Sequence, residues 1–191
     1  MREDYFGFVT DAELAAQNQA LATTPYRGLV VLCPYLPDLD LDDIAAQDHY
    51  GEFLTGTLLP RAREKLAILP GREHAGIDGV SLGGGVALHV GTRFPEHFGA
   101  VSGLQPAIQA KDAGRWAARF VSATQRVGAL AVRLQTSTGD PFRGPTRALS
   151  AQLGKLGVEH TFTETPGPHD YDYNRGPGAY GLLTFHDHAL R

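Results

Sequence analysis

A serine flanked by glycines is the residue in this chain best suited to nucleophilic chemistry. Residues 79–83, Gly-Val-Ser-Leu-Gly, match the pattern G-x-S-x-G. They end an expected short strand at 76–80 and open an expected helix at 82–93. In such a strand–turn–helix unit the serine hydroxyl is lifted away from the sheet, and side chains at the two glycines would collide with neighbouring backbone. The pattern therefore predicts Ser81 as a nucleophile, the alternative being a glycine-rich turn without chemistry.

A serine hydroxyl is a poor nucleophile at neutral pH and needs a base that a carboxylate orients. After a serine of this motif, the acid and then the histidine follow along the chain. Asp140 comes after an expected strand at 131–136, and His169 comes directly after the last expected strand. Reactive groups gather at this carboxyl edge of a parallel sheet. We predict Asp140 as the acid and His169 as the base, with a turn role beside Pro141 as the alternative for Asp140.

The remaining histidines lack this combination of order and position. His160 lies inside an expected strand, and we expect structural or surface roles for it and for His89 and His97. His186 and His188 stand two residues apart in an expected C-terminal helix, on different faces, which makes a poor metal pair. The carboxylates next to the base are predicted to be solvated loop charges: Asp170 and Asp172.

No metal or cofactor is predicted. Residues 38–43 are rich in aspartate and resemble the start of a calcium loop, but the sixth position is Asp43 rather than glycine and the twelfth is His49 rather than glutamate. The glycines at 83–85 lack the Lys-Ser/Thr that follows in a phosphate-binding loop. We expect residues 38–43 to form a solvated loop near the rim of the site, and the glycines at 83–85 to permit close packing of the helix.

Strand-like and helix-like segments alternate, which predicts one α/β domain with a mostly parallel sheet flanked by helices. Residues 29–33 form a continuous apolar run, typical of a strand buried on both faces, and Cys33 at its end is predicted to be a buried structural thiol. The other expected strands are at 76–80, 99–104, 131–136 and 158–163, and the expected helices are at 11–21, 50–67, 82–93 and 148–156, with Trp116 in a helical or irregular segment.

The composition is that of an ordinary globular protein: 191 residues, 42% hydrophobic and 20% charged. A net charge of −4 gives no electrostatic footprint for nucleic acid or an anionic membrane surface. The single cysteine excludes an intrachain disulfide and favours a reducing compartment. Neither a signal-peptide core nor a membrane-spanning stretch is evident, so we expect a cytoplasmic protein. Nothing in the composition indicates an oligomeric state.

Five segments in a fixed order resemble the esterase family of α/β-hydrolases that includes esterase D-like and feruloyl esterase-like enzymes. They are residues 50–64, 79–85, 94–103, 138–142 and 167–171. The resemblance implies hydrolysis of a small-molecule carboxylic ester, or transfer of its acyl group, without metal or cofactor. It assigns the nucleophile to Ser81, the acid to Asp140 and the base to His169.

One departure from that family concerns the N-terminal strands. Family members usually carry two or three strands before the one matched by residues 29–33, and the last of these ends in a loop that supplies an oxyanion donor. Only 28 residues precede Leu29 here, and most have helical character. The Leu82 N–H is the expected donor, with the N–H of Tyr35 or Leu36 as a candidate second one. We expect a domain incomplete at its N-terminus, or a minimal hydrolase that closes its sheet differently.

Several functions remain compatible with these residues. An esterase, an acyltransferase and a peptidase use the same triad, and a chain that lacks one oxyanion donor can also be an inactive, non-catalytic scaffold. The sequence does not identify the ester substrate.

Overall fold

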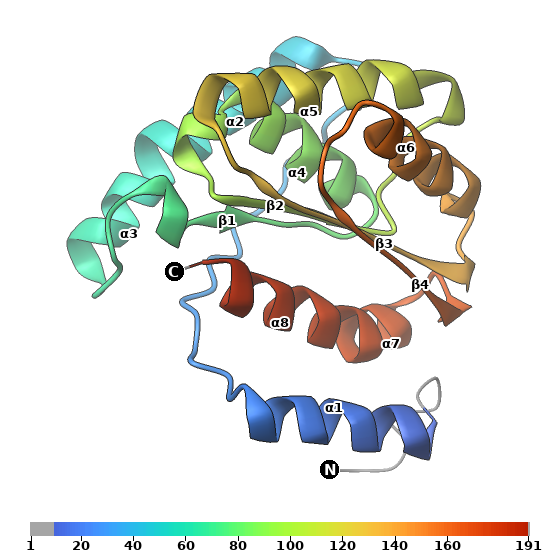
Figure 1. The fold of residues 1–191 in the computed structure, drawn as a ribbon. Coiled ribbons are helices and arrows are strands. Elements are labelled where there is room, and N and C mark those ends of the chain that lie inside the picture. The colour runs from blue at the N-terminus through green and yellow to red at the C-terminus, as the bar shows by residue number, and fades with distance from the viewer. Residues whose placement is uncertain (1–9, 191) are drawn as a thin grey trace.

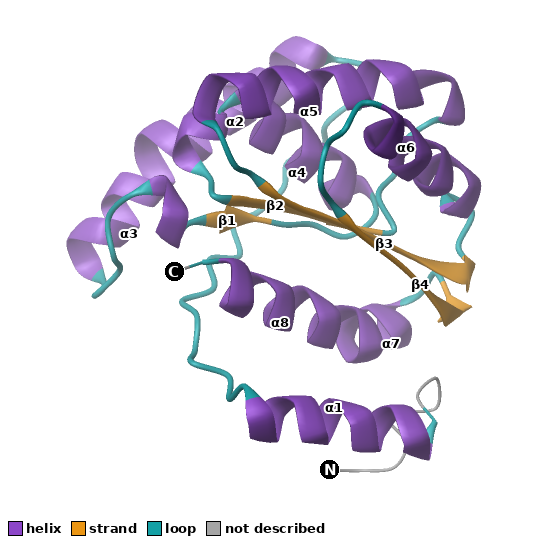
Figure 2. Ribbon diagram, viewed as in Figure 1, coloured by secondary structure: helices purple, strands orange, loops and turns teal. Residues whose placement is uncertain are grey.

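Four parallel strands form a single sheet at the centre of the computed structural model, which describes residues 10–190. The strands lie in the order β1-β2-β3-β4, and helices cover both faces of the sheet (Figure 1, Figure 2). This arrangement confirms the predicted α/β class. The strand bounds are Gly76–Ile77 for β1, Ala100–Leu104 for β2, Ala131–Gly139 for β3 and Thr161–Pro168 for β4.

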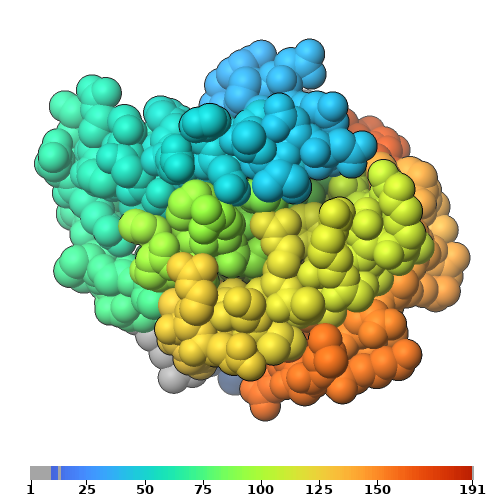
Figure 3. All heavy atoms as spheres, turned by 90° about the horizontal axis from the view of Figure 1, so that it is seen from above, coloured from blue at the N-terminus to red at the C-terminus, as the bar shows by residue number. Residues whose placement is uncertain are grey.

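The helices form a layer on each side of the sheet (Figure 1). One side carries α2 (Ile44–Phe53), α4 (Leu82–Arg93), α5 (Ala113–Val127) and α6 (Arg143–Lys155). Figure 3 looks onto this side, where the segment of α2 and α3 (Leu59–Lys65), in cyan and teal, lies beside the yellow segment around α5. The opposite side carries α7 (Tyr171–Tyr173) and α8 (Ala179–Ala189), with α1 (Asp11–Thr23) beyond α8.

The core lies between the sheet and the α4–α5–α6 layer. In α5 the residues Ala113, Ala117, Phe120 and Ala123 are spaced three or four apart and are all buried, which is the stripe expected of a helix packed on a sheet. From the strands, buried Val101, Val132 and Leu134 meet this layer. Because each fully buried large apolar side chain contributes about 1.5–3 kcal/mol, this interface is a main source of stability.

Two helices begin earlier than the hydrophobic pattern indicated. We predicted a helix start near Tyr50, whereas α2 begins at Ile44, because the Asp43 carboxylate accepts the Ala46 N–H at 3.0 Å and caps it. A π-helical turn, Leu54–Leu58, then joins α2 to α3. We predicted α6 from residue 148, but it begins at Arg143, and its first turn accommodates Pro145 because N–H groups there have no helical partner.

The predicted strand at residues 29–33 is wrong. The segment has no ladder partner within residues 10–190, and Val30 and Val31 are 53% and 59% exposed. Cys33 is exposed as well, so the predicted buried thiol is also wrong. A strand can be buried on both faces only when neighbouring strands and helices enclose it, whereas β1, the nearest strand, pairs with β2 alone among the described strands.

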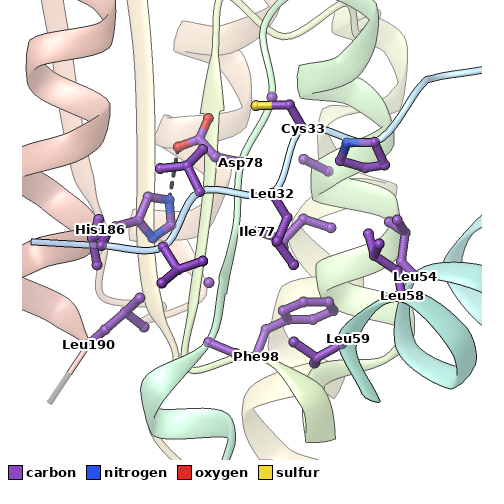
Figure 4. Close-up of a pocket in the computed structure, with 18 of the residues that line it drawn as sticks. Leu32, Cys33, Leu54, Leu58, Leu59, Ile77, Asp78, Phe98, His186 and Leu190 are labelled. Atoms are coloured by element: carbon purple, nitrogen blue, oxygen red, sulfur yellow. Dashed lines mark hydrogen bonds and ion pairs between the residues drawn. The ribbon is translucent and has the colours of Figure 1, made fainter. Parts of the chain in front are cut away.

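A cavity of about 470 Å³ lies between the extended segment at residues 29–34 and the open edge of β1. Figure 4 shows Leu32, Ile77 and Phe98 among its apolar walls. His186 and Asp78 supply polar groups, with His186 Nε2 3.0 Å from Asp78 Oδ2. Neither His186 Nδ1 nor Asp78 Oδ1 has a partner among the described residues. The cavity reaches Gly79 and Gly83, but the predicted catalytic side chains do not line it.

The last strand is displaced relative to its prediction. We expected it at residues 158–163, whereas β4 runs over Thr161–Pro168, so His160 lies outside the strand. His160 instead pairs with Ser150 Oγ at 2.8 Å. The strand β3 also runs three residues beyond its expected end, to Gly139, because it pairs with β4 along its length. No helix within residues 10–190 is long and apolar enough to cross a membrane.

Candidate active site

The serine turn has the strained backbone that its motif requires. Ser81 lies between β1 and α4 with φ 55° and ψ −118°, a left-handed conformation that costs a non-glycine residue about 1–3 kcal/mol. Three backbone bonds hold it there: the Ser81 N–H donates to the Leu104 carbonyl at 3.0 Å, and the Ser81 carbonyl accepts from Ala107 at 2.8 Å and from Gly85 at 3.1 Å. The end of β2 therefore supports the turn.

The glycines around Ser81 have unequal roles. A Cβ added at Gly79 would lie 2.1 Å from the Gly83 carbonyl oxygen, so a side chain is excluded there, as predicted. At Gly83 nothing lies within 4 Å of an added Cβ, so the predicted collision at this position is wrong. The following glycines do permit close packing, since Cβ atoms at Gly84 and Gly85 would come within 3.0 Å of Pro106 Cα and 2.9 Å of the Ala107 carbonyl oxygen.

Strand register places the acid and the base side by side. Gly139, the last residue of β3, is the partner of Pro168, the last residue of β4. Asp140 and His169 are the next residues, so both leave the sheet at the same level of its carboxyl edge. The structure therefore brings together the three side chains that the sequence singled out, which are far apart along the chain.

The three side chains form a continuous hydrogen-bonded relay. His169 Nε2 lies 2.9 Å from Ser81 Oγ, and His169 Nδ1 lies 2.8 Å from Asp140 Oδ1. The Asp140 side chain is fully buried, and its carboxylate also accepts from Thr136 Oγ1 at 2.6 Å and from the Phe142 N–H at 3.0 Å. The Phe142 ring meets the imidazole edge-on, with centroids 5.7 Å apart. These contacts fix both the carboxylate and the imidazole ring.

The Leu82 N–H, at the first position of α4, makes no hydrogen bond with any described residue. A free N–H beside the serine at a helix N-terminus can bind developing negative charge. The candidate second donors lie in the extended segment after Cys33: Tyr35 is exposed, and Leu36 packs against the core. Their role as donors stays a prediction.

His89 is a structural histidine, as predicted. It is fully buried in α4, with Nε2 2.7 Å from Asp48 Oδ1 and Nδ1 2.9 Å from the Arg119 guanidinium. Burial lowers the pKa of His89, against the opposing effect of the Asp48 carboxylate. Within residues 10–190 no three histidine, cysteine or carboxylate side chains are grouped so that they could hold a metal ion.

A second cluster of charges lies beside the site, where α6 meets β4. Glu164 Oε1 is 2.7 Å from Arg143 Nη2, and Glu164 Oε2 is 2.6 Å from Arg147 Nε. Hydrogen bonds from Arg143 and then Arg147 lower the pKa of Glu164, although desolvation acts in the opposite direction. The cluster ties the helix after Asp140 to the strand before His169.

Sequence reasoning missed the side chains that support the relay: Gln105, Thr136, Ser137 and Phe142. Each occupies its place because of strand register or loop geometry. No motif identifies them, and the one sequence signal is that Thr136 and Phe142 stand within four residues of Asp140.

A parallel sheet with a strained serine turn between a strand and a helix, and with an acid and a histidine following at the same edge, defines the α/β-hydrolase class. The family model described as "Putative esterase" matches residues 42–176. The chain belongs to this esterase family.

Solved structures agree with this fold. A ferulic acid esterase superposes with a TM-score of 0.62 at 21% identity, covering 74% of this chain and 62% of that one. The S-formylglutathione hydrolase of Staphylococcus aureus gives 0.61 at 14% identity, covering 72% and 63%. The ferulic acid esterase of Anaeromyces mucronatus gives 0.59 at 19% identity, covering 85% and 60%. The chain thus spans less than two thirds of each neighbour's length. No curated protein matches it.

Proposed function

We propose that this chain hydrolyses a small carboxylic ester through an acyl-enzyme formed on Ser81. The observation that carries the proposal is the unbroken relay from the buried Asp140 carboxylate through His169 to Ser81 Oγ, with both links at 2.8–2.9 Å. Membership of an esterase family supports the reaction class.

In the first half of the reaction Ser81 Oγ attacks the ester carbonyl carbon, and His169 Nε2 takes the hydroxyl proton. The Asp140 carboxylate accepts the hydrogen bond from His169 Nδ1–H, which fixes the tautomer and stabilises the imidazolium. The Leu82 N–H donates to the oxyanion of the tetrahedral intermediate. The protonated His169 then gives its proton to the departing alkoxide.

In the second half a water molecule replaces the alcohol. His169 Nε2 takes a proton from the water as it attacks the acyl carbonyl, and the acid leaves when Ser81 Oγ recovers its proton. Because one oxyanion donor typically contributes about 10²–10³ in rate, a second N–H from Tyr35 or Leu36 would separate an efficient enzyme from a slow one.

The test uses a matched serine inside the same molecule. Ser150 also pairs with a histidine, since its Oγ lies 2.8 Å from His160 Nε2, but His160 Nδ1 lies 2.9 Å from a backbone carbonyl, that of Val158, rather than from a carboxylate. The Ser150–His160 pair therefore has the serine–histidine hydrogen bond but lacks the buried carboxylate.

We would measure hydrolysis of p-nitrophenyl acetate by the wild type, Ser81→Ala and Ser150→Ala, and map the site labelled by a fluorophosphonate. The wild type and Ser150→Ala are expected to be active and labelled at residue 81, and Ser81→Ala is expected to be inactive and unlabelled. Activity retained in Ser81→Ala would refute the nucleophile, and a folded but inactive wild type would favour the non-catalytic scaffold. A product formed only with an added alcohol would identify an acyltransferase.

A further inference from the structure

The loop that carries His169 is anchored through the carbonyl of the residue before it. Proline has no N–H, so the carbonyl is the only backbone hydrogen-bonding group of Pro168. This oxygen accepts from Gln105 Nε2 at 2.9 Å and from Ser137 Oγ at 3.0 Å. The two donors are also joined, with Gln105 Nε2 2.7 Å from Ser137 Oγ.

The hydrogens of this cluster are fully accounted for. One Nε2 hydrogen of Gln105 goes to Ser137 Oγ and the other to the Pro168 carbonyl, while the Ser137 hydroxyl hydrogen goes to the same carbonyl. Gln105 and Ser137 are both fully buried, so water does not replace these contacts. A flipped amide would point Oε1 at the Pro168 oxygen, which has no hydrogen to give.

Gln105 also belongs to the support of Ser81. It directly follows Leu104, whose carbonyl accepts the Ser81 N–H, and its own N–H donates to the Gln135 carbonyl at 2.6 Å. Its φ of 48° is the left-handed conformation that costs a non-glycine residue free energy. Its Oε1 is buried without a partner among the described residues. An apolar side chain of similar length would avoid the cost of the unpaired Oε1, so what the amide contributes at this position is its two N–H donors.

We propose that Gln105 is a positioning residue that holds His169 at hydrogen-bonding distance from Ser81 by clamping the Pro168 carbonyl, with Ser137 as the second member of the clamp. This inference rests on the proposed function. The backbone of Gln105 is joined to the serine turn and its side chain to the histidine loop, so one residue sets the separation of nucleophile and base. A displacement of about 1 Å between reacting groups can cost about 10²-fold in rate.

The test compares Gln105→Met with Gln47→Met. Methionine keeps the length of glutamine and removes both donors. Gln47 is the matched control, because it is also buried and its Nε2 also donates to a backbone carbonyl, that of Leu41, at 2.8 Å, without a hydrogen bond to the triad side chains or to Pro168. We expect Gln105→Met to lower kcat for p-nitrophenyl acetate by at least about 10-fold with KM within about two-fold, and Gln47→Met to leave both unchanged.

A second readout does not depend on turnover. The Nδ1 proton of His169, bonded to Asp140, is expected to give a far-downfield proton NMR signal that is lost or broadened in Gln105→Met and retained in Gln47→Met. If Gln105→Met does not fold, Ser137→Ala replaces it, with a smaller loss of kcat and the same change of signal. Unchanged kcat and signal in these variants overturn the clamp. If the wild type proves inactive, the proposed function fails while the NMR comparison still decides whether the clamp positions His169.

Discussion

The two glycines of the serine motif provide a sharp test, because the motif treats them alike and the structure does not. A methyl group at Gly79 would lie 2.1 Å from the oxygen and 2.2 Å from the carbon of the Gly83 carbonyl. Ordinary contacts begin near 3.4 Å, so backbone must move by on the order of 1 Å, and no flexible side chain can absorb the shift. Overpacking of this kind costs about 1–3 kcal/mol or more, and a rigid backbone contact belongs at the upper end.

Gly83→Ala is the matched control. Its added Cβ meets nothing within 4 Å, and position 83 lies within α4, where alanine is favoured over glycine by about 0.5–1 kcal/mol. We expect Gly79→Ala to lose about 3 kcal/mol in urea unfolding followed by circular dichroism, equivalent to about 6–12 °C in Tm for a chain of this size. Gly83→Ala is expected to equal or exceed the wild type. A Gly79→Ala variant within about 0.5 kcal/mol of the wild type would show that this turn is not sterically constrained.

Three further predictions concern the acid, the core and the charge cluster. Asp140→Asn is expected to lower kcat by about 10⁴-fold with p-nitrophenyl acetate, because an amide can donate to His169 and fix the wrong tautomer; a loss under 10-fold would argue against the role of the acid. Phe120→Ala empties a fully buried core position and should cost about 3–5 kcal/mol in urea unfolding; a smaller loss would mean that α5 collapses into the space. The pKa of Glu164 is lowered below its ordinary value of 4.5 by its arginine partners, so its stabilising effect is present above that pH and is lost as the pH falls through the folded-state pKa. Glu164→Gln should therefore be less stable than the wild type at pH 7, and the difference should shrink toward pH 3; a difference independent of pH would contradict the ionic origin.

The sequence predicted best where local rules and tertiary structure agree. The helix at 82–93 has the bounds that its pattern indicated, and the strand at 99–104 differs by one residue. Their signals are local: a glycine-rich turn opens the helix, and a short apolar run marks the strand. The residues Ser81, Asp140 and His169 were found in the same way, since a motif and two strand ends locate them. Their proximity is now observed, while their catalytic roles remain a prediction.

The strand predictions were wrong where pairing with other strands, rather than local sequence, determines the secondary structure. Residues 29–33 have strand-forming side chains, but no strand of the described part of the chain pairs with them, and propensity alone does not form a ladder. The ends of β3 and β4 were missed because pairing carries both beyond their apolar runs, to Gly139 and Pro168. The clamp on Pro168 depends on that same register, which a single sequence does not encode in any short pattern. The sequence therefore predicted the three side chains of the candidate site and missed the contacts that hold them in place.

The two edges of the sheet differ in their capacity to recruit other polypeptide strands. At β4 the ion pairs of Glu164 with Arg143 and Arg147 place charge along the edge strand, a feature that discourages intermolecular pairing. At β1 the edge is only two residues long and borders an apolar cavity, with the valines at 30 and 31 exposed nearby. The short length of β1 is the main feature that protects this edge from pairing with strands of other molecules. Within residues 10–190 this edge therefore has fewer of the features that discourage pairing with a strand of another molecule, and charged substitutions at Val30 or Val31 are expected to make such pairing less favourable.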